Sequence, residues 1–587
     1  MKADPATPLD FRSTNSLWCS VLVETLVRLG LQRAVVCPGS RSAPLTFALA
    51  RHPGIEAISV LDERSAAFLA LGLAKQQGRP VALVCTSGTA GANFLPAVIE
   101  AHESEVPLLV LTADRPPELR DCRSGQTIDQ QKIFGRFVRF HHELAAPDRK
   151  LALLRYLRQT AVHAYERALR PTPGPVHLNC PFRDPLAPTP EEAPAATTSG
   201  AFADFFAGIG NHHSAEGAAD FRVEVPGRPR ITAATRGVIV VGPTEPADPA
   251  LMAKRVGRVS RALGWPVLAD ALSPVRTHAR SAGTVVAHYE AILRNDSLAE
   301  RLRPEIVYCV GGWPTGKVLR SWLQRCDPRA VMIAEGDANR DGLHLRCQHL
   351  RAGLGAWSAG FRGHRSPGRQ ARLWIRAEAA VRRILADGLA VKKGLVEPVC
   401  IPVLAGSLPA NTLVFAASSM PVRDLEYFWP AGNGRQRFRF NRGANGIDGT
   451  LSTALGLAHG DGQPAVLLTG DLALLHDTNG FLSARRLRGS LTVVLINNRG
   501  GGIFEHLPVA QFDPPFEEFF ATPQEAHFRG LCGAYGVDYV RIRDRKHLSA
   551  LLRALPARGV RVLEVRTDRK KDAAFRKALL AGAAAEL

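Results

Sequence analysis

Two segments late in the chain place oxygen-bearing side chains directly after apolar runs. Asp471 follows the run that ends in Gly470, and Asn498 follows the next run, which ends in Asn497. One strand–helix–strand unit separates them, and the carboxyl ends of parallel strands meet at the ligand-binding edge of an open α/β sheet. With the backbone carbonyl of Gly500 they offer an all-oxygen partial shell that suits Mg²⁺ and phosphate oxygens. We predict a metal–diphosphate site here; the alternative is a helix cap at Asp471 and a turn at the asparagines.

A carboxylate near the start of the chain occupies a similar position. Glu63 comes just after the apolar run 58–61 and before a segment, 65–77, that has apolar residues at helical spacing. It therefore lies at the carboxyl end of a predicted strand, where a carboxyl group can exchange protons with a bound ligand. The alternative is an ordinary acidic residue at a helix start, which the helix macrodipole favours.

The segments that position these residues alternate between apolar runs and amphipathic stretches, a pattern that predicts strand–helix units and parallel sheets. With 587 residues the chain is long enough for three or four domains. We predict an α/β protein with three parallel-sheet domains, at 1–187, 231–365 and 366–587. A linker at 188–230, rich in Pro, Ala and Gly, carries one short predicted helix at 201–207.

The predicted strands are 34–37, 57–61, 81–86, 107–112, 176–179, 238–241, 266–268, 306–310, 331–334, 412–416, 465–469, 491–496, 539–542 and 562–565. The predicted helices include 65–77, 92–102, 249–263 and 315–326.

Composition excludes several classes of protein. Apolar residues make up 46% and charged residues 22%, the mix of an ordinary globular chain, and no apolar run is long enough to span a membrane. The 10 cysteines are scattered without a Cys-x-x-Cys pair, and the amino terminus lacks the pattern of a secretion signal, so we expect a cytoplasmic protein. His212-His213 lies in the linker without zinc-site spacing. The 74 Lys and Arg against 54 Asp and Glu give a net charge of +20, but they form no basic stripe, which argues against nucleic-acid binding.

The pair Gly470-Asp471 and Asn497-Asn498 resembles the motif that binds thiamine diphosphate (ThDP) and Mg²⁺ in ThDP-dependent enzymes. The residue after the Asp is usually small in that superfamily and is Leu472 here. Leu472, His476-Asp477-x-Asn479-Gly480 and Gly500-Gly501-Gly502-Ile503-Phe504 resemble one branch, the MenD family of 2-succinyl-5-enolpyruvyl-6-hydroxy-3-cyclohexene-1-carboxylate (SEPHCHC) synthases. Further motifs similar to that family are Cys37-Pro38-Gly39-Ser40-Arg41-Ser42-Ala43-Pro44-Leu45, Asp62-Glu63-Arg64, Thr86-Ser87-Gly88-Thr89-Ala90, Thr112-Ala113-Asp114-Arg115-Pro116-Pro117-Glu118-Leu119 and Asn441-Arg442-Gly443-Ala444-Asn445-Gly446-Ile447-Asp448-Gly449. The likeness covers most of the first and third domains and is weak in the middle, where Thr315-Gly316-Lys317 matches best.

The resemblance implies a role for each matching residue. Glu63 would hydrogen-bond N1′ of the aminopyrimidine and so help to remove the proton from thiazolium C2, and Ile447 would support the bent cofactor. Residues implied to bind Mg²⁺, or Mn²⁺, are Asp471, Asn498 and Gly500, and those implied to lie beside the cofactor are Leu472, Ile503 and Phe504. Arginine binds carboxylates through its planar fork, and both implied substrates are dianions. Residues implied to meet isochorismate are Ser40, Arg41, Arg115, Gln126 and Lys317, and those implied to meet the part derived from 2-oxoglutarate are Ser419, Arg423 and Arg442.

The implied activity is that of a transferase of menaquinone biosynthesis. It would decarboxylate 2-oxoglutarate and add the succinyl carbanion equivalent to isochorismate in a 1,4-addition, giving SEPHCHC and CO₂. In the family the site forms between two subunits, which implies a homodimer at least and a homotetramer as the usual state.

Two alternatives stay open. Another ThDP-dependent 2-oxoacid decarboxylase, or an acetolactate-synthase-like carboligase, would keep Glu63 and Asp471 without needing the four arginines together. A non-catalytic α/β protein that binds an anionic ligand or nucleic acid would explain the charge but not the set of motifs.

Overall fold

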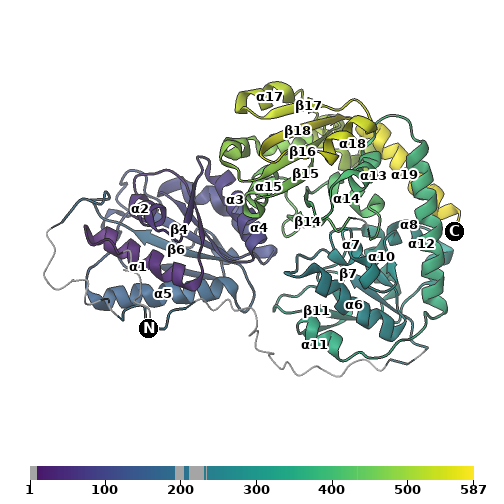
Figure 1. Ribbon diagram of the computed structural model, residues 1–587, viewed down its shortest axis with the longest axis horizontal. Helices are drawn as coiled ribbons and strands as arrows, with labels where there is room; N and C mark the ends of the chain where they lie inside the picture. The colour runs from purple at the N-terminus through teal and green to yellow at the C-terminus, as the bar shows by residue number, and fades with distance from the viewer. Residues whose placement is uncertain (1–8, 192–201, 203, 211–230, 233, 433) are drawn as a thin grey trace. The chain divides into compact units, whose positions relative to one another are not determined.

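Three six-stranded sheets, in which every pair of neighbouring strands is parallel, form the framework of the protein (Figure 1). The computed structural model describes residues 9–191, 202, 204–210, 231–232, 234–432 and 434–587. The chain divides into two compact units, the first of which takes the chain up to residue 218 together with Arg442–Asp461 and Asp477–Leu487. The second unit takes the rest.

The sheet of the first unit has the strand order β2-β1-β3-β4-β6-β5. Its strands are β1 (Arg33–Val36), β2 (Glu56–Ser59), β3 (Val81–Cys85), β4 (Leu108–Asp114), β5 (Phe140–Glu143) and β6 (Pro175–Pro181). The helices that belong to it in sequence are α1 (Thr14–Leu29), α2 (Ala43–Arg51), α3 (Glu63–Gln77), α4 (Leu95–Glu103) and α5 (Leu151–Leu169).

Helices cover both faces of this sheet, which explains why its central strands are continuous apolar runs. In β3, Ala82 and Val84 pack with residues of α1 and α5, whereas Leu83 and Cys85 pack with residues of α3 and α4. Alternate side chains of a strand point to opposite faces, so both faces of a sheet buried in this way must be apolar.

A second helix packs tightly on α3 within the first unit. This helix, α15 (Thr450–Asp461), follows the segment 442–449, and its backbone approaches that of α3 at two glycines. A Cβ atom on Gly72 would lie 2.2 Å from the carbonyl oxygen of Thr453, and one on Gly456 would lie 2.1 Å from that of Leu69. Only glycine permits this distance, so the pair fixes α3, and with it the segment that begins at Glu63, against α15.

The second unit contains the other two sheets, with strand orders β12-β11-β10-β7-β8-β9 and β14-β13-β15-β16-β18-β17. The strands of the former are β7 (Gly237–Val241), β8 (Val267–Ala269), β9 (Val285–Val286), β10 (Ile306–Val310), β11 (Arg329–Ala334) and β12 (Arg346–Arg351). The strands of the latter are β13 (Leu413–Ala416), β14 (Arg437–Phe440), β15 (Pro464–Gly470), β16 (Ser490–Asn497), β17 (Asp538–Arg541) and β18 (Gly559–Arg566).

The helices of the second unit pack with its two sheets, and many of them, though not α6 or α11, share one large core with both. They are α6 (Pro249–Leu263), α7 (Pro274–Thr277), α8 (Tyr289–Ile292), α9 (Asp296–Arg301), α10 (Lys317–Cys326), α11 (Leu354–Ala359), α12 (Arg369–Val391), α13 (Glu397–Ser407), α14 (Met420–Phe428), α16 (Asp471–His476), α17 (Phe528–Tyr535), α18 (Arg545–Arg553) and α19 (Arg569–Ala585). Buried residues of α12, such as Trp374 and Val381, belong to the same apolar cluster as Val240 of β7 and Val466 of β15. One continuous cluster therefore joins the two sheets.

The predicted α/β class with three parallel sheets is confirmed, and the strands that the sequence missed are all edge strands. Each of β5, β9, β12 and β14 lies at the end of a strand order. Of the predicted helix 201–207, residues 204–207 form turns, and 201 and 203 lie outside the described residues, as do His212-His213.

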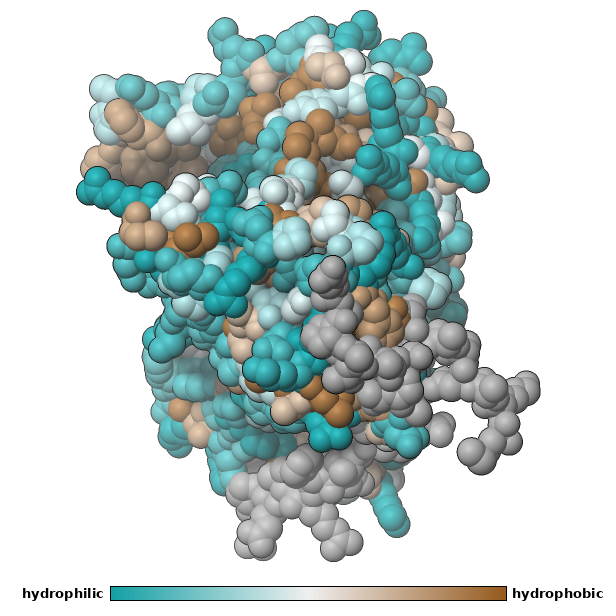
Figure 2. Space-filling model, turned by 90° about the vertical axis from the view of Figure 1, so that its left-hand side faces the viewer, coloured by the Kyte–Doolittle hydropathy of each residue, from teal (hydrophilic) through white to brown (hydrophobic). Residues whose placement is uncertain are grey.

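No helix in the described part of the chain is both long enough and apolar enough to cross a membrane. On the face drawn in Figure 2, hydrophilic residues predominate and hydrophobic residues form scattered patches.

Candidate functional site

The predicted site residues divide between the two units, and most of them follow the carboxyl end of a strand. The first unit contains Ser40, Arg41, Glu63, Arg115, Gln126, Arg442 and Ile447. The second contains Lys317, Ser419, Arg423, Asp471, Leu472, Asn498, Gly500, Ile503 and Phe504. The edge of a parallel sheet that is formed by the carboxyl ends of its strands is where ligands bind in open α/β folds.

Asp471 and the loop around Gly500 meet at the ends of two paired strands, because Gly470 of β15 lies opposite Ile496 of β16. The Asp471 carboxylate is buried and accepts hydrogen bonds from the backbone N–H groups of Leu472 and Gly500, both at 2.9 Å. Burial raises the pKa of Asp471 to about 6. A bound cation would stabilise the ionised form of such a carboxylate.

The loop that follows Asn498 requires glycine. Gly500 has a φ of 131°, and a Cβ atom there would lie 2.3 Å from the carbonyl oxygen of Ala521. The carbonyl of Gly500 accepts one hydrogen bond, from the N–H of Gly502 at 2.9 Å, and so keeps a lone pair for a further partner.

Asn498 presents an oxygen that lacks a hydrogen-bond donor. Its side chain is 8% exposed, and its Nδ2 donates to Oε1 of Glu397. Its Oδ1 is buried and has no hydrogen-bond partner among the residues that the structure describes. Because buried amide oxygens are almost always satisfied, this oxygen calls for an additional partner, and a hard cation such as Mg²⁺ is suitable. The residues present therefore fit a metal–diphosphate group.

Three apolar residues accompany these ligands. Leu472 lies in α16, and Ile503 and Phe504 lie in a short 3₁₀ helix, η7 (Gly502–His506). All three are half-buried, and the Phe504 ring packs edge-on against Phe520 with 5.8 Å between the centroids. They keep apolar surface accessible next to the polar ligands, as a cofactor ring requires.

Glu63 is the first residue of α3, yet its neighbour Asp62 makes the helix cap. Asp62 Oδ1 accepts from the N–H of Ser65 at 2.8 Å. The half-buried Glu63 carboxylate makes no hydrogen bond or ion pair with any described residue. It is close enough to Cys37 that its charge adds to burial in raising the pKa of that thiol. An acidic side chain that is not used for capping and has no ion-pair partner is available to a ligand.

The turn that begins at Asp477 holds the start of α3 in place. Asn479, in the 3₁₀ helix η6 (Thr478–Arg486), donates from Nδ2 to Oδ2 of Asp62 at 2.9 Å. Asp477 is fully buried and accepts from the N–H and Oγ of Ser452 in α15, at 2.7 and 2.9 Å. Burial raises the pKa of Asp477 to about 6. The sequence motif that contains Asp477 and Asn479 thus supports the position of Glu63.

The segment that carries Ile447 is held by a buried carboxylate from α4. Glu100 accepts from the N–H groups of Gly443 and Ala444 at 3.0 and 2.7 Å. Ile447 itself is half-buried, and its carbonyl accepts from Oγ1 of Thr450 at 2.7 Å. These bonds fix the backbone on which both Ile447 and the predicted ligand Arg442 lie.

Arg41 and Arg115 place two positive charges close together in the first unit. Burial and the charge of Arg41 lower the pKa of Arg115. Arg41 donates to the carbonyl of Phe182 at 2.9 Å and lies 3.5 Å from a carboxylate oxygen of Asp184, while its Nε is buried without a partner among the described residues. Two arginines in mutual repulsion are stabilised by an anion that bridges them.

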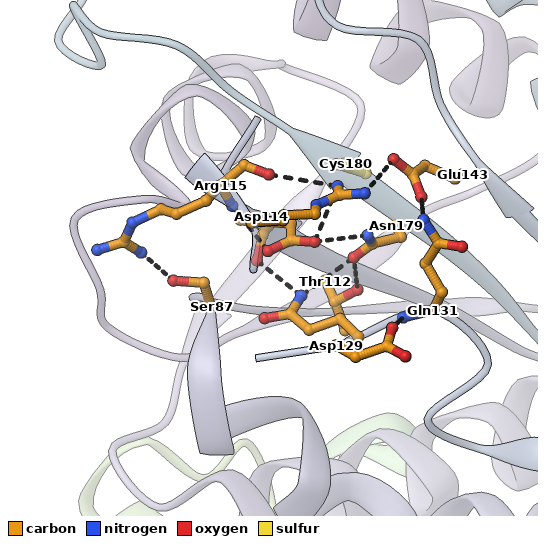
Figure 3. A network of polar contacts seen from close by, with 12 residues as sticks. Ser87, Thr112, Asp114, Arg115, Asp129, Gln131, Glu143, Asn179 and Cys180 are labelled. Carbon is orange, nitrogen blue, oxygen red and sulfur yellow. Dashed lines mark hydrogen bonds and ion pairs between the residues drawn. The ribbon is translucent and has the colours of Figure 1, made fainter. Parts of the chain in front are cut away.

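A buried polar network lies behind Arg115 (Figure 3). Asp114 is fully buried, accepts from the N–H of Arg115 at 2.7 Å and from Nδ2 of Asn179 at 2.8 Å, and pairs with Arg120 at 3.1 Å. In the view of Figure 3 the Arg115 side chain points away from Asp114 to Ser87, whose Oγ accepts its hydrogen bond. The network fixes the Arg115 backbone, while the Arg115 guanidinium points away from Asp114.

Ser87 also links Gln126 to this group, because Gln126 Nε2 donates to the Ser87 carbonyl at 3.0 Å. The structure therefore brings together Arg41, Arg115 and Gln126, three of the residues that the resemblance implies to meet isochorismate. Ser40 is exposed, directly before Arg41.

The other predicted ligands are divided between the chain's two units. In the second unit, Arg423 is half-buried on α14 and donates to the carbonyl of Ser419 at 2.6 Å, and burial lowers its pKa. Ser419 has a φ of 72°, a strained conformation of the kind found at functional sites. Lys317 is exposed at the first position of α10. Arg442 belongs to the first unit.

Several supporting residues could not be found from the sequence. Glu397 lies 101 positions from Asn498, Asn179 lies 65 positions from Asp114, and Glu100 lies 344 positions from Ala444. No local motif marks them, since each acts only through a partner that the fold brings near.

Three family models match successive parts of the chain. The model for the thiamine pyrophosphate enzyme N-terminal TPP binding domain matches residues 19–133, and that for the middle domain of thiamine pyrophosphate enzymes matches 229–416. The model for the C-terminal TPP binding domain matches 424–565. Asp471 and Asn498 fall within the last match, and Glu63 and Arg115 fall within the first.

Full-length relatives are similar to the chain from end to end. A 2-succinyl-5-enolpyruvyl-6-hydroxy-3-cyclohexene-1-carboxylate synthase from Nostoc sp. is 51% identical, with 99% of both chains covered. Proteins of the same name from Trichormus variabilis and Gloeothece citriformis are 51% and 50% identical, with 99% and 97% of this chain and 99% and 98% of theirs covered. The chain belongs to the 2-succinyl-5-enolpyruvyl-6-hydroxy-3-cyclohexene-1-carboxylate synthase family of thiamine diphosphate enzymes.

Proposed function

We propose that the protein is a SEPHCHC synthase, a transferase of menaquinone biosynthesis. It decarboxylates 2-oxoglutarate and transfers the remaining succinyl unit to isochorismate by 1,4-addition, releasing SEPHCHC and CO₂. The observation that carries this proposal is the 51% identity to a named synthase over 99% of both chains. The chemistry of the site agrees with it, since both substrates are dianions and the site offers arginines.

The cation site is proposed to anchor the cofactor. Thiamine diphosphate supplies an electron sink for the decarboxylation when it is bound. Asp471, Asn498 and the Gly500 carbonyl would hold Mg²⁺, or Mn²⁺, and the metal would hold the diphosphate. Leu472, Ile503 and Phe504 would contact the rest of the cofactor.

Glu63 is proposed to exchange a proton with N1′ of the cofactor's aminopyrimidine. Its carboxylate has no partner among the described residues, and Asp62 already makes the helix cap, so Glu63 is free for this task. Ile447, on the segment held by Glu100, would support the cofactor in its bent form.

The arginines are proposed to neutralise the two substrates. Ser40, Arg41, Arg115, Gln126 and Lys317 would bind isochorismate, and Ser419, Arg423 and Arg442 would bind 2-oxoglutarate. The proximity of Arg41 to Arg115 supports the first assignment, because two repelling guanidinium groups fit a dicarboxylate. The half-buried Arg423 supports the second.

Three further features complete the proposal. The pyrimidine-binding, central and diphosphate-binding domains would span 1–187, 231–365 and 366–587, ranges that each enclose one of the three sheets, with 188–230 as a linker. The protein would act as a homodimer at least, or as a homotetramer. It would reside in the cytoplasm, which agrees with ten free thiols.

A reconstituted assay tests the proposed reaction. Full-length protein stripped of metal and cofactor is incubated with 2-oxoglutarate, isochorismate, ThDP and Mg²⁺, while isochorismate loss and CO₂ release are followed. We expect both signals, in equal amounts, when all four components are present, and neither signal when ThDP or Mg²⁺ is left out. Pyruvate in place of 2-oxoglutarate serves as the control donor. Consumption of pyruvate with isochorismate left unchanged would identify the protein as a different ThDP-dependent carboligase or decarboxylase.

A further inference from the structure

Two adjacent asparagines at the end of β16, Asn497 and Asn498, each donate a hydrogen bond to a buried glutamate, but their side-chain oxygens differ. Asn497 donates from Nδ2 to Oε1 of the buried Glu564 at 2.6 Å, and Asn498 donates from Nδ2 to Oε1 of the buried Glu397. The Oδ1 of Asn497 accepts from the N–H of Arg499 at 3.3 Å. The Oδ1 of Asn498 has no partner among the described residues. Asn497 is therefore satisfied by the protein, and Asn498 is not.

The carboxylate of Glu397 determines which end of the Asn498 amide is left free. An ionised carboxylate can only accept hydrogen bonds, so it binds the NH₂ group of the amide and turns the oxygen away from itself. An amide that could rotate would be able to present its NH₂ group to the cation site, and NH₂ cannot bind a cation. Fixing the amide removes that nonproductive orientation before the metal arrives.

Glu397 is itself held by an arginine from another helix. Arg576 of α19 donates to Oε2 of Glu397 at 2.7 Å, and it also binds both carboxylate oxygens of Asp424, at 2.6 and 2.7 Å. Glu397, Asp424 and Arg576 are all at most 4% exposed. A buried arginine fork shared by two carboxylates fixes the direction of each, because its donors lie in one plane.

We propose that Glu397, held by Arg576, is a positioning residue that fixes the Asn498 amide with its oxygen directed to the cation site. This inference rests on the proposed Mg²⁺–ThDP function of Asp471, Asn498 and Gly500. Residues that orient a metal ligand from behind commonly change metal affinity by about 10–100-fold when they are replaced.

The test is a Mg²⁺ titration of the metal-free, full-length protein at saturating ThDP, followed by tryptophan fluorescence or calorimetry. Glu397→Gln removes the preference for one amide orientation while keeping the side chain's size, and we expect the apparent Mg²⁺ Kd to rise about 10–100-fold. Glu564→Gln is the matched control, since it disturbs the equivalent bond to Asn497. It should leave the Mg²⁺ Kd within about twofold of wild type, even if it lowers the stability of the protein as much as Glu397→Gln does.

A rescue separates orientation from general damage. The double variant Glu397→Gln, Asn498→Asp puts an oxygen at either end of the ligating group, so orientation no longer matters. We expect it to recover most of the Mg²⁺ affinity lost in Glu397→Gln, which a purely structural role of Glu397 would not allow. If Glu397→Gln does not fold, Glu397→Asp keeps the charge beside Arg576 but withdraws the carboxylate from Asn498, and it should also weaken Mg²⁺ binding.

The outcomes that contradict the inference are distinct from those that contradict the proposed function. If Asn498→Ala weakens Mg²⁺ binding but folded Glu397→Gln and Glu397→Asp proteins bind it like wild type, the positioning role is wrong and the metal site stands. An equal loss in Glu397→Gln and Glu564→Gln also contradicts the positioning role. If wild type shows no Mg²⁺-dependent ThDP binding, or Asn498→Ala binds Mg²⁺ normally, the proposed metal site and this inference both fail.

Discussion

At the scale of single residues, the start of α3 carries two acidic side chains, Asp62 and Glu63, of which Asp62 caps the helix. The first turn of a helix offers unpaired N–H groups and favours acidic side chains, so two acidic residues here could simply stabilise α3. The bond from Ser65 N–H to Asp62 assigns that structural task to Asp62. The Glu63 carboxylate has no partner in the described part of the chain, which leaves it available for the role proposed for it.

Replacing Glu63 by Gln should separate cofactor activation from cofactor binding. Gln keeps the size of the side chain but cannot share its proton in the same way, and general acid–base groups contribute about 10²–10⁴-fold. We expect exchange of the C2 proton of bound ThDP, measured by quenched-flow NMR, to slow by about that factor, with the ThDP Kd changed only a few-fold. Asp62→Asn should instead lower the melting temperature and leave the exchange rate nearly unchanged. Wild-type exchange in Glu63→Gln would exclude the proposed role.

The sequence indicated candidate ligands, but it did not indicate the residues that support them. Asp471 and Asn498 could be predicted because one strand–helix–strand unit places both at the same edge of a parallel sheet. Glu397 could not, because its only signal is a bond to Asn498, 101 positions away. The same holds for Asn179, which fixes Asp114 behind Arg115. Candidate ligands follow from local patterns, whereas the residues that support them depend on tertiary packing.

At the scale of elements, the contact between α3 and α15 depends on two glycines. Gly72→Ala would put a methyl group 2.2 Å from the Thr453 carbonyl oxygen and force the helices apart. Overpacking of this kind costs about 1–3 kcal/mol. We expect a lower melting temperature by scanning fluorimetry and weaker ThDP binding, because the displaced helix begins at Glu63. Gly582→Ala, in α19, is the control: nothing lies within 4 Å of the added atom, and alanine favours a helix, so stability should be unchanged or slightly higher.

The buried Asp477 should make the stability of the α3–α15–η6 assembly depend on pH. Burial raises its pKa to about 6 in the folded protein, against about 3.9 in an unfolded chain. The folded state thus holds the proton more tightly, so the stability contribution of Asp477 improves as pH falls through 6 and is lost as pH rises. Between pH 7 and 5 the gain is about 1 kcal/mol.

Asp477→Asn tests this dependence, because the amide can keep both bonds to Ser452 without a charge. We expect the variant's melting temperature, relative to that of wild type, to be higher at pH 7 than at pH 5. A difference that is the same at both pH values would show that Asp477 does not titrate in this range.

The strands that the sequence missed share a physical cause. Central strands are buried on both faces and read as apolar runs, as Val-Ala-Leu-Val-Cys does in β3. The edge strands β5, β12 and β14 instead carry His, Arg and Glu side chains, and β9 has two residues. Charged and short edge strands prevent unwanted pairing between sheets, and the same composition hides them from pattern analysis.

At the scale of the whole molecule, only a few of the many basic residues are proposed to bind substrate. The net charge of +20 comes from basic residues throughout the chain, most of which lie on the surface. Arg41 and Arg115 belong to the first unit, and Arg423 belongs to the second. The residue sets proposed for isochorismate and for 2-oxoglutarate have no residue in common, so single replacements can separate their contributions by experiment.

Single replacements of these arginines should divide the reaction into its two halves. A hydrogen bond between charged groups contributes about 1.5–3 kcal/mol, and about 1.4 kcal/mol corresponds to a factor of ten, so each Arg→Ala should cost at least about tenfold in kcat/KM. Arg423→Ala should slow CO₂ release from 2-oxoglutarate alone, measured in the absence of isochorismate. Arg115→Ala should leave that half-reaction nearly intact and raise the KM for isochorismate, since its guanidinium lies beside that of Arg41. Arg383→Ala, on the exposed face of α12, should change neither quantity. If Arg115→Ala abolished decarboxylation while isochorismate still bound, the two sub-sites would have been assigned in the wrong order, and the dependence on ThDP would remain.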